Sequence, residues 1–173
     1  MHYCQGVRLK DKENTAWFQN SQRLREQKRW SSCARPWTSR PGKLLRGVPK
    51  DDRIIEAINL GWMLHVEQKV AEGEDINDPE ELSIGLFIDY SQDPTVRKSW
   101  GSLGTAITSS SIYSYERDRA IVPAETLQML GFPRNMNLGG MQPGHIRDMA
   151  GESMSVPTIA MVLAAILIGG NFE

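Results

Sequence analysis

Two stretches near the end of the chain carry its clearest structural signals: RAIVPAETLQMLGFP, residues 119–133, and GESMSVPTIAMVLAAILIG, residues 151–169. In the first, Pro123 stands where a first-turn proline belongs and Gly131 where a glycine closes a helix, so a short helix is expected between them. In the second, a helix is expected after Ser155, and its side chains leave no polar face. A helix that is apolar on every side must be enclosed by other elements or bind a partner.

The order and spacing of these residues resemble the last two conserved blocks of the DNA cytosine-5 methyltransferases. The first block is an Arg-x-x-x-Pro-x-Glu helix ending in Gly-Phe-Pro, matched here by Arg119, Pro123, Glu125 and residues 131–133. The second is a Gly-Asn-Ser-Val-type turn before a terminal helix, matched by residues 151–157. The resemblance implies an α/β fold, namely the C-terminal portion of a Rossmann-like S-adenosylmethionine-dependent methyltransferase, incomplete, with DNA as its partner.

The first block implies a role in organising the DNA target. In the family it holds the target-recognition region against the catalytic domain, and here that role would fall to Arg117, Arg119 and Glu125. The residues also have a purely structural interpretation. Arg119 and Glu125 can bridge the end of a strand and the first turn of a helix, where a carboxylate favours the helix dipole.

The second block implies contact with the cofactor. In the family this turn lines part of the S-adenosylmethionine pocket, so Gly151, Glu152 and Ser153 are the candidate cofactor-binding residues. Glu152 replaces the usual Asn, which exchanges a hydrogen-bond donor and acceptor for an acceptor alone. The structural alternative is that Ser153 or Ser155 simply caps the last helix.

The residues that would perform methyl transfer are missing. Methylation at cytosine C5 needs a thiolate, a carboxylate and a pocket for a flipped base. The family supplies the first two from a Pro-Cys loop and a Glu-Asn-Val segment, after a Gly-rich cofactor loop, and none of these three occurs here. Cys4 follows Tyr3 and Cys33 follows Ser32. We therefore expect no catalytic residues and no activity from the isolated chain, which could complement a missing N-terminal half.

The first fifty residues differ in charge from the rest of the chain. Residues 1–50 carry 12 Lys/Arg and 3 Asp/Glu, a net charge of +9, whereas residues 51–173 carry 8 and 18, a net charge of −10. Pro and Gly are interspersed with Arg and Lys in residues 31–49, which indicates a linker or an extended strap. We expect a flexible, poorly ordered basic arm at 1–50 and a methyltransferase-like domain at 51–173.

The basic arm suggests an alternative function. An anionic partner, most commonly nucleic acid, would suit its charge, although a solvated tail has the same composition. The chain would then be a non-enzymatic nucleic-acid-binding module that uses phosphate contacts and base stacking. Seven aromatic and basic residues of the arm would carry this function: Trp17, Trp30, Trp37, Arg23, Arg25, Arg29 and Arg35.

The middle of the chain predicts one long helix and two β elements. Asp51 or Asp52 is a suitable N-cap for an amphipathic helix that ends near Gly73. An apolar run within residues 82–90 predicts a buried strand, and a second β element is expected at 111–115.

Several further features are interpreted from composition. Residues 15–30 could form a polar helix, residues 89–92 a functional turn, residues 101–108 a Gly/Ser/Thr turn and residues 139–144 a loop. His65 is expected on the polar side of the long helix.

No targeting, membrane or metal signal is recognised. The N-terminus lacks the apolar run of a signal peptide, and the most apolar stretch, 156–168, is too short to span a bilayer. The three histidines are scattered and the two cysteines lack zinc-site spacing. The protein is expected to be intracellular and soluble, without a membrane partner, and nuclear if it is eukaryotic.

Overall fold

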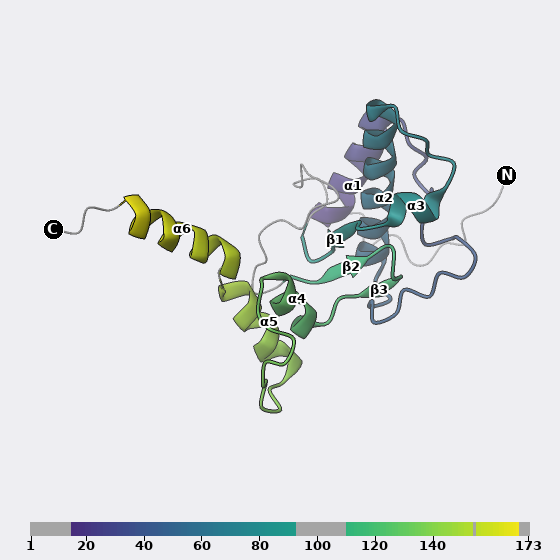
Figure 1. The fold of residues 1–173 in the computed structure, drawn as a ribbon. Helices are drawn as coiled ribbons and strands as arrows, with labels where there is room; N and C mark the ends of the chain where they lie inside the picture. Colours follow the sequence, from purple (N-terminus) through teal and green to yellow (C-terminus); the bar gives the residue numbers. More distant parts are fainter. Residues whose placement is uncertain (1–14, 93–109, 154, 170–173) are drawn as a thin grey trace. The chain divides into compact units, whose positions relative to one another are not determined.

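The computed structural model describes residues 15–92, 110–153 and 155–169. The chain divides into two compact units: unit 1 comprises residues 1–104 and 111–120, and unit 2 comprises residues 105–110 and 121–173. Unit 1 contains α1 (Ala16–Lys28), α2 (Asp52–Glu72), α3 (Pro79–Ser83), β1 (Phe87–Asp89), β2 (Ile112–Ser114) and β3 (Arg119–Ala120) (Figure 1). Unit 2 contains α4 (Pro123–Met129), α5 (Pro143–Glu152) and α6 (Val156–Gly169).

Helix α2 is the longest element of unit 1, and both of its ends are capped as the sequence predicts. The Asp51 carboxylate accepts a hydrogen bond from the Arg53 N–H at 2.8 Å, which satisfies one of the free amides of the first turn. At the other end Gly73 adopts a φ of +78°, and its N–H donates to the Val70 carbonyl at 3.1 Å. A left-handed glycine at this point closes the helix at low conformational cost.

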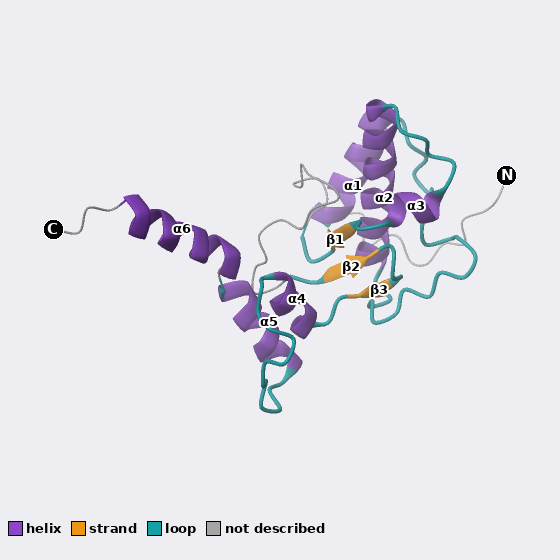
Figure 2. Ribbon diagram, in the orientation of Figure 1, coloured by secondary structure: helices purple, strands orange, loops and turns teal. Residues whose placement is uncertain are grey.

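Three short strands form an antiparallel sheet in the order β1-β2-β3 (Figure 2). Ile88 pairs with Tyr113, and Tyr113 with Ala120. Ile88 and Tyr113 are buried, so this face of the sheet points toward the core. A single parallel bridge joins Arg46 to Arg119, and it is the only parallel pairing among the described residues. The described sheet therefore contains no parallel strand pair of the kind that a Rossmann-like fold has.

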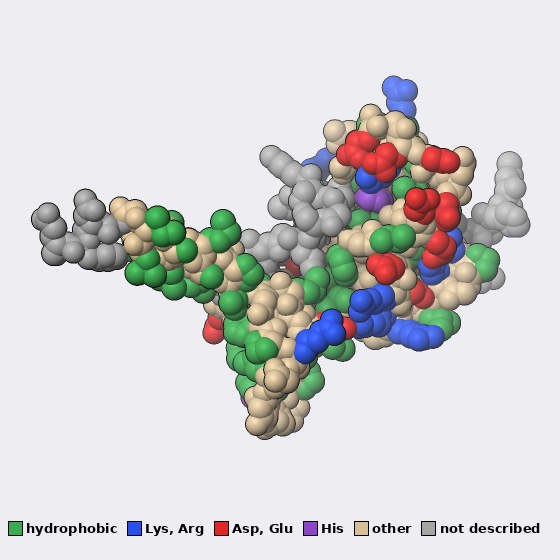
Figure 3. Space-filling model, viewed as in Figure 1, with side chains coloured by type: hydrophobic (Ala, Val, Ile, Leu, Met, Phe, Trp, Pro, Cys, Tyr) green, Lys and Arg blue, Asp and Glu red, His purple; other side chains and the backbone are tan. Residues whose placement is uncertain are grey.

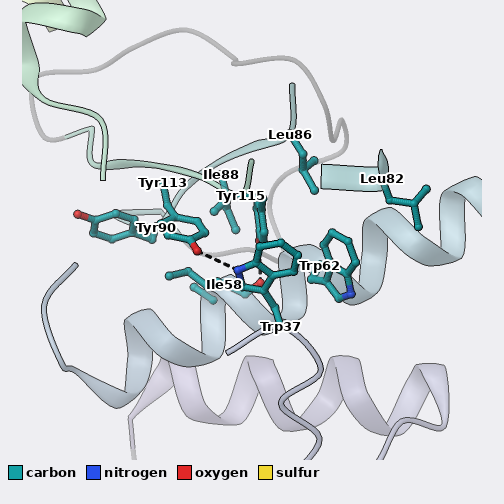
Figure 4. Packing of buried hydrophobic residues seen from close by; sticks show 10 residues of the cluster. Trp37, Ile58, Trp62, Leu82, Leu86, Ile88, Tyr90, Tyr113 and Tyr115 are labelled. Carbon is teal, nitrogen blue, oxygen red and sulfur yellow. Dashed lines mark hydrogen bonds between the residues drawn. The ribbon is translucent and has the colours of Figure 1, made fainter. Parts of the chain in front are cut away.

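The core of unit 1 is built around the buried indole of Trp37. This side chain is 0% exposed, and its Nε1–H donates to the Tyr113 hydroxyl oxygen at 2.8 Å (Figure 4). Its ring centroid lies 4.5 Å from that of Trp62 and 5.1 Å from that of Tyr115. The Tyr115 hydroxyl donates to the Ile58 carbonyl at 2.7 Å. Aromatic contacts, together with the hydrogen bonds of the Trp37 Nε1–H and the Tyr115 hydroxyl, thus hold the Trp37 segment against both α2 and the sheet.

The described part of the basic segment is packed into unit 1. Helix α1 lies against α2, and the Arg25 side chain is only 1% exposed. Arg25 Nε and Nη2 donate to the two Glu56 carboxylate oxygens at 2.7 and 3.0 Å, and Ser21 also donates to Glu56. This differs from the expected flexible arm with a boundary near residue 50, because Trp37 and Arg25 find their partners in α2 and the sheet.

Unit 2 has a smaller core between α4 and α5. Leu127 of α4 and Ile146 and Ala150 of α5 are its buried residues. Phe132, from the Gly-Phe-Pro sequence, packs against them together with other half-buried apolar side chains. The Phe132 N–H also donates to the Leu127 carbonyl at 3.1 Å, which holds the aromatic ring beside the end of α4.

Three sequence expectations differ from the structure or lie outside it. The loop expected at 139–144 is shorter than predicted. Pro143 and Gly144 already belong to α5, because a proline suits the first turn of a helix. His65 is 6% exposed instead of lying on a polar side, since α3 covers this part of α2 and the Leu82 carbonyl lies 3.1 Å from His65 Nε2. The turn expected at 101–108 lies outside the described residues.

Candidate functional site

The two sequence blocks of unit 2 meet where α4 ends and α6 begins. The Val156 N–H donates to the Leu130 carbonyl at 2.8 Å. Gly131 has a φ of +93°, and a Cβ at this position would lie 2.8 Å from Pro157 Cδ and 3.2 Å from Val156 Cβ. Both the backbone conformation and the lack of space therefore require glycine. We call this contact of residues 130–131 with residues 156–157 the block junction.

Two residues of the first block, Pro123 and Glu125, stabilise the start of α4. Pro123 occupies the first turn, and Glu125 Oε2 accepts a hydrogen bond from the Val122 N–H at 3.1 Å. A carboxylate at this point satisfies a free amide and interacts favourably with the N-terminal end of the helix dipole. Glu125 thus has a defined structural role.

The three candidate cofactor residues lie together at the end of α5. Glu152 is the last residue of this helix and is exposed. Ser153 Oγ donates to the Met149 carbonyl at 2.5 Å, and the Ser153 N–H donates to the Ala150 carbonyl at 3.3 Å. Ser153 therefore closes α5, whereas the expected alternative was a cap at the start of the last helix. The carboxylate of Glu152 is the side chain of the three that faces solvent.

The three residues expected to organise the DNA target are divided between the two units. Arg117 lies in the turn between β2 and β3, where its N–H donates to Ser114 Oγ at 3.3 Å, and Arg119 lies in β3. Arg119 Nη1 donates to the Ala120 carbonyl at 3.1 Å. Both arginines belong to unit 1 and Glu125 belongs to unit 2.

The structure separates the seven candidate arm residues into buried and accessible groups. Trp37 and Arg25 are buried, so neither is available for base stacking or phosphate contacts. A charge is buried at low cost only when it is paired, which is the role of Glu56. The tryptophans at 17 and 30 are half-buried, and the arginines at 23, 29 and 35 are exposed.

The turn at residues 89–92 is a structural motif with a buried carboxylate. Asp89 is 2% exposed, and its Oδ1 accepts hydrogen bonds from the Ser91 N–H, the Ser91 hydroxyl and the Ser111 N–H at 3.0, 2.6 and 3.0 Å. Its Oδ2 accepts from Gln92 Nε2 at 3.1 Å. The hydrogen bond from Ser111 joins the end of β1 to the start of β2, and the other three close the turn itself. Together they account for the polar residues that suggest a functional turn in the sequence.

The sheet contains two tyrosines whose hydroxyls are held inside unit 1. Burial raises the pKa of Tyr113, and the hydrogen bond from its hydroxyl to Asp118 Oδ1 at 2.5 Å raises it further. Burial likewise raises the pKa of Tyr115. Both hydroxyls are protonated donors, so Tyr113 links Trp37 to Asp118 as a structural element. Sequence patterns gave no signal for this chain of hydrogen bonds.

Neither a metal site nor a paired thiol is found in the described part of the chain. No group of three or more His, Cys, Asp or Glu side chains there could hold a metal ion. Cys33 is a free, exposed cysteine, and Cys4 lies outside the described residues.

One run has the length and hydropathy of a membrane span. It extends from Pro143 to Gly169, includes both α5 and α6, and qualifies by length and composition only. Ser153 within it has extended backbone angles, with φ −80° and ψ 144°. Helix α6 alone has 14 residues. At about 1.5 Å per residue it would measure about 21 Å, which is shorter than the roughly 30 Å hydrocarbon core.

Comparisons with known proteins give no match: no family model, no curated protein and no solved structure is similar to this chain.

Proposed function

We propose that this chain is the C-terminal part of a DNA cytosine-5 methyltransferase-like protein. Its role is to position the DNA target and the terminal helix, while a separate N-terminal half supplies the nucleophile, the Glu-Asn-Val carboxylate and the Gly-rich cofactor loop. S-adenosylmethionine would then be bound jointly, with Gly151, Glu152 and Ser153 contributing one edge of its site. The isolated chain has no methyltransferase activity.

The block junction carries this proposal. The two sequence blocks are separated by residues 134–150, yet the Val156 N–H donates to the Leu130 carbonyl and Gly131 has room only for a hydrogen atom beside Pro157. Residues of both blocks therefore pack together in one local structure. Gly131 of the first block has to be glycine because Pro157 of the second block leaves no room for a Cβ.

The exposure of α6 further supports a missing half. None of its residues is buried, and its large apolar side chains are 36–88% exposed. An apolar surface on all sides of a helix is unfavourable in water and marks a site of association. A catalytic half that encloses α6 would remove this surface from water.

Complementation tests the proposal directly. The full chain is co-expressed with a DNA cytosine-5 methyltransferase truncated before its own Arg-x-x-x-Pro-x-Glu block, and methylation of the target DNA is measured by bisulfite sequencing. We expect methylation only when both pieces are present. A soluble pair that co-purifies without methylating DNA would contradict the proposal, as would methylation by the chain alone.

Two glycine variants provide a matched control for the block junction. Gly131→Ala places a methyl group against Pro157, whereas Gly139→Ala alters a residue that also has a positive φ, +53°, but has no atom within 4 Å of the added Cβ. We expect Gly131→Ala to abolish complementation and Gly139→Ala to retain most of it. Equal losses would mean that backbone strain alone, and not the junction, explains the result.

Glu152→Asn tests the cofactor contact separately. Since Asn restores a neutral donor and acceptor, this variant should increase the affinity of the complemented pair for S-adenosylmethionine, measured by isothermal titration calorimetry. Glu152→Gln, which is also neutral but one methylene longer, is the control. Unchanged affinity in the Asn variant would remove Glu152 from the proposed cofactor site while leaving the complementation result intact.

A further inference from the structure

A tight turn that follows α1 is fixed by the buried guanidinium of Arg25. Arg25 Nη1 donates to the Ser31 carbonyl at 2.6 Å, and Nη2 donates to the Ala34 carbonyl at 3.0 Å. The Ala34 N–H also donates to the Ser31 carbonyl at 3.3 Å, which closes a β-turn over residues 31–34. Because this guanidinium is buried, both carbonyls point inward and the residues on either side of the turn are held close together. We call residues 29–35 the Arg25 turn.

Arg29 begins the Arg25 turn in a backbone conformation that arginine rarely adopts. It is the C-cap of α1, with φ +57° and ψ 34°, and its N–H donates to the Glu26 carbonyl at 3.0 Å. Glycine is the usual residue at a left-handed position after a helix, because a Cβ makes this conformation costly. A long, charged side chain at such a position indicates that the side chain itself has a function.

The exposed side chains of the Arg25 turn are mainly arginine and serine. The five exposed residues are Arg29, Ser31, Ser32, Cys33 and Arg35. A guanidinium donates two parallel hydrogen bonds to the oxygens of a phosphate, and serine hydroxyls donate to the same oxygens. These residue types are therefore suited to contact with a sugar-phosphate backbone.

The acidic residues of unit 1 neutralise other cations and leave the Arg25 turn positive. No Asp or Glu occurs between residues 27 and 50. Acids of α2 and α3 pair with four cations of the basic segment: Arg25 with Glu56, Lys28 with Glu67, and both Arg40 and Lys43 with Glu80. On the face drawn in Figure 3 the acidic side chains gather over α3 and the end of α2. Within the described part of the chain, the side chains of Arg29 and Arg35 have no ion-pair or hydrogen-bond partner.

We propose that Arg29, Arg35 and the serine hydroxyls of the Arg25 turn bind the phosphate backbone of duplex DNA. Arg25 is a positioning residue, since it fixes the turn from inside unit 1 without touching the DNA. The inference goes beyond the proposed function, because it assigns a DNA contact to unit 1, whereas the block junction lies in unit 2. A turn places neither a helix nor a β-ribbon in the major groove, so this contact holds the DNA backbone and does not read its sequence.

Arg29→Gly separates DNA binding from folding. Glycine suits a φ of +57°, so this variant should keep or raise the midpoint of urea denaturation while it loses a phosphate contact. Binding of the full chain to a duplex of about 20 base pairs is measured by electrophoretic mobility shift over a salt series. Arg29→Gly/Arg35→Ala should bind at least about tenfold more weakly than the wild type, with a salt slope smaller by about 2.

Two further variants make the test specific. Arg46→Ala/Lys50→Ala is the charge-matched control, since both residues are exposed and lie outside the Arg25 turn. It should weaken binding by less than about twofold. Glu26→Gln removes the exposed acidic residue that precedes the turn, so this variant should bind DNA more tightly.

The opposite results would overturn the site. Equal losses in the two double variants would indicate delocalised charge, and binding to phosphatidylserine vesicles without binding to DNA would assign the turn to anionic membranes. A lower urea midpoint for Arg29→Gly, with unchanged DNA binding, would reduce Arg29 to a favourable interaction with the dipole of α1.

The complementation experiment distinguishes this inference from the proposed function. Failed complementation by a chain that binds DNA through the Arg25 turn would remove the proposed function and keep the inference. Successful complementation by a chain that does not bind DNA through this turn would remove the inference and keep the proposed function.

Discussion

Helices α2 and α6 are both rich in apolar residues, but they differ completely in burial. Helix α2 buries seven residues, among them Ile58, Leu60 and Trp62, whereas α6 buries none. The apolar side of α2 is covered by the strap that carries Trp37 and by the sheet, and its buried polar residues Asn59 and His65 have hydrogen-bond partners in the strap and in α3. Helix α6 has no polar face, and no element in the described part of the chain buries any of its residues. Composition alone therefore does not decide burial, which depends on whether the chain supplies a complementary surface.

The largest effect that would test this comparison comes from removing Trp37. Because its indole is fully buried and contacts α2 and the sheet, Trp37→Ala should destabilise unit 1 by about 3–5 kcal/mol. Trp17→Ala, which changes a half-buried tryptophan, should cost about 1 kcal/mol or less. Urea denaturation followed by circular dichroism measures both. Similar values for the two variants would mean that Trp37 does not anchor the core.

A somewhat smaller loss is expected from Glu56→Gln. The variant leaves the 1% exposed Arg25 guanidinium without its counter-charge, so unfolding should become easier by about 3 kcal/mol. Glu67→Gln breaks the Lys28–Glu67 pair, whose side chains are 32% and 45% exposed, and should cost less than about 1 kcal/mol. Replacing both Arg25 and Glu56 by apolar residues should recover much of the loss. If Glu56→Gln resembled Glu67→Gln, α1 would not be fastened to α2 by this pair.

A smaller, pH-dependent effect is expected at His65. Burial lowers the pKa of His65 below its ordinary 6.5, with Lys69 contributing in the same direction and the Leu82 carbonyl, Glu72 and Glu74 opposing it. The unfolded chain then binds a proton more readily than the folded one, so stability is full above pH 6.5 and falls as the pH decreases toward the lowered folded-state pKa. Denaturation midpoints between pH 5 and 8 should show this slope.

Two histidine variants isolate that slope. His65→Phe should flatten it, because the variant has no group that titrates in this range. His145→Gln alters an exposed histidine and should leave the slope unchanged. A slope that persists in His65→Phe would assign the pH dependence to other groups.

The smallest effect on unfolding is expected in α6. Leu167 is 71% exposed, so Leu167→Lys should change the unfolding free energy by no more than about 0.5 kcal/mol. The same variant should reduce binding of the dye ANS, since it interrupts the exposed apolar surface. Leu163→Lys is a second variant on the same helix, at a residue 53% exposed. A loss of several kcal/mol in both would show that α6 is packed in solution.

The elements with local end signals could be predicted from the sequence. Asp51 and Gly73 define α2, and Pro123 and Gly131 define α4, because each signal acts within one helical turn. Contacts between distant segments could not be predicted in the same way. The insertion of Trp37 and the bridge of Arg46 to Arg119 depend on tertiary packing, and local composition indicated only a strap or a linker.

In the candidate site, too, local signals could be predicted from the sequence and contacts between distant residues could not. The sequence identified both blocks of unit 2, but their contact at Gly131 and Pro157 required coordinates. The closure of α5 by Ser153 was also missed, because a serine before an apolar run is typical of the start of a helix.

The distribution of tryptophan gives unit 1 an optical label that unit 2 lacks. Four tryptophans, at positions 17, 30, 37 and 62, lie in the described part of unit 1, and the sequence of unit 2 contains none. The fluorescence of tryptophan therefore reports on this unit alone, and the close Trp37–Trp62 pair, with centroids 4.5 Å apart, should add an exciton band to the circular dichroism spectrum. Loss of the Trp37 core would expose this indole to water and shift the emission to the red, so the fluorescence follows the unfolding of unit 1 without a contribution from α6.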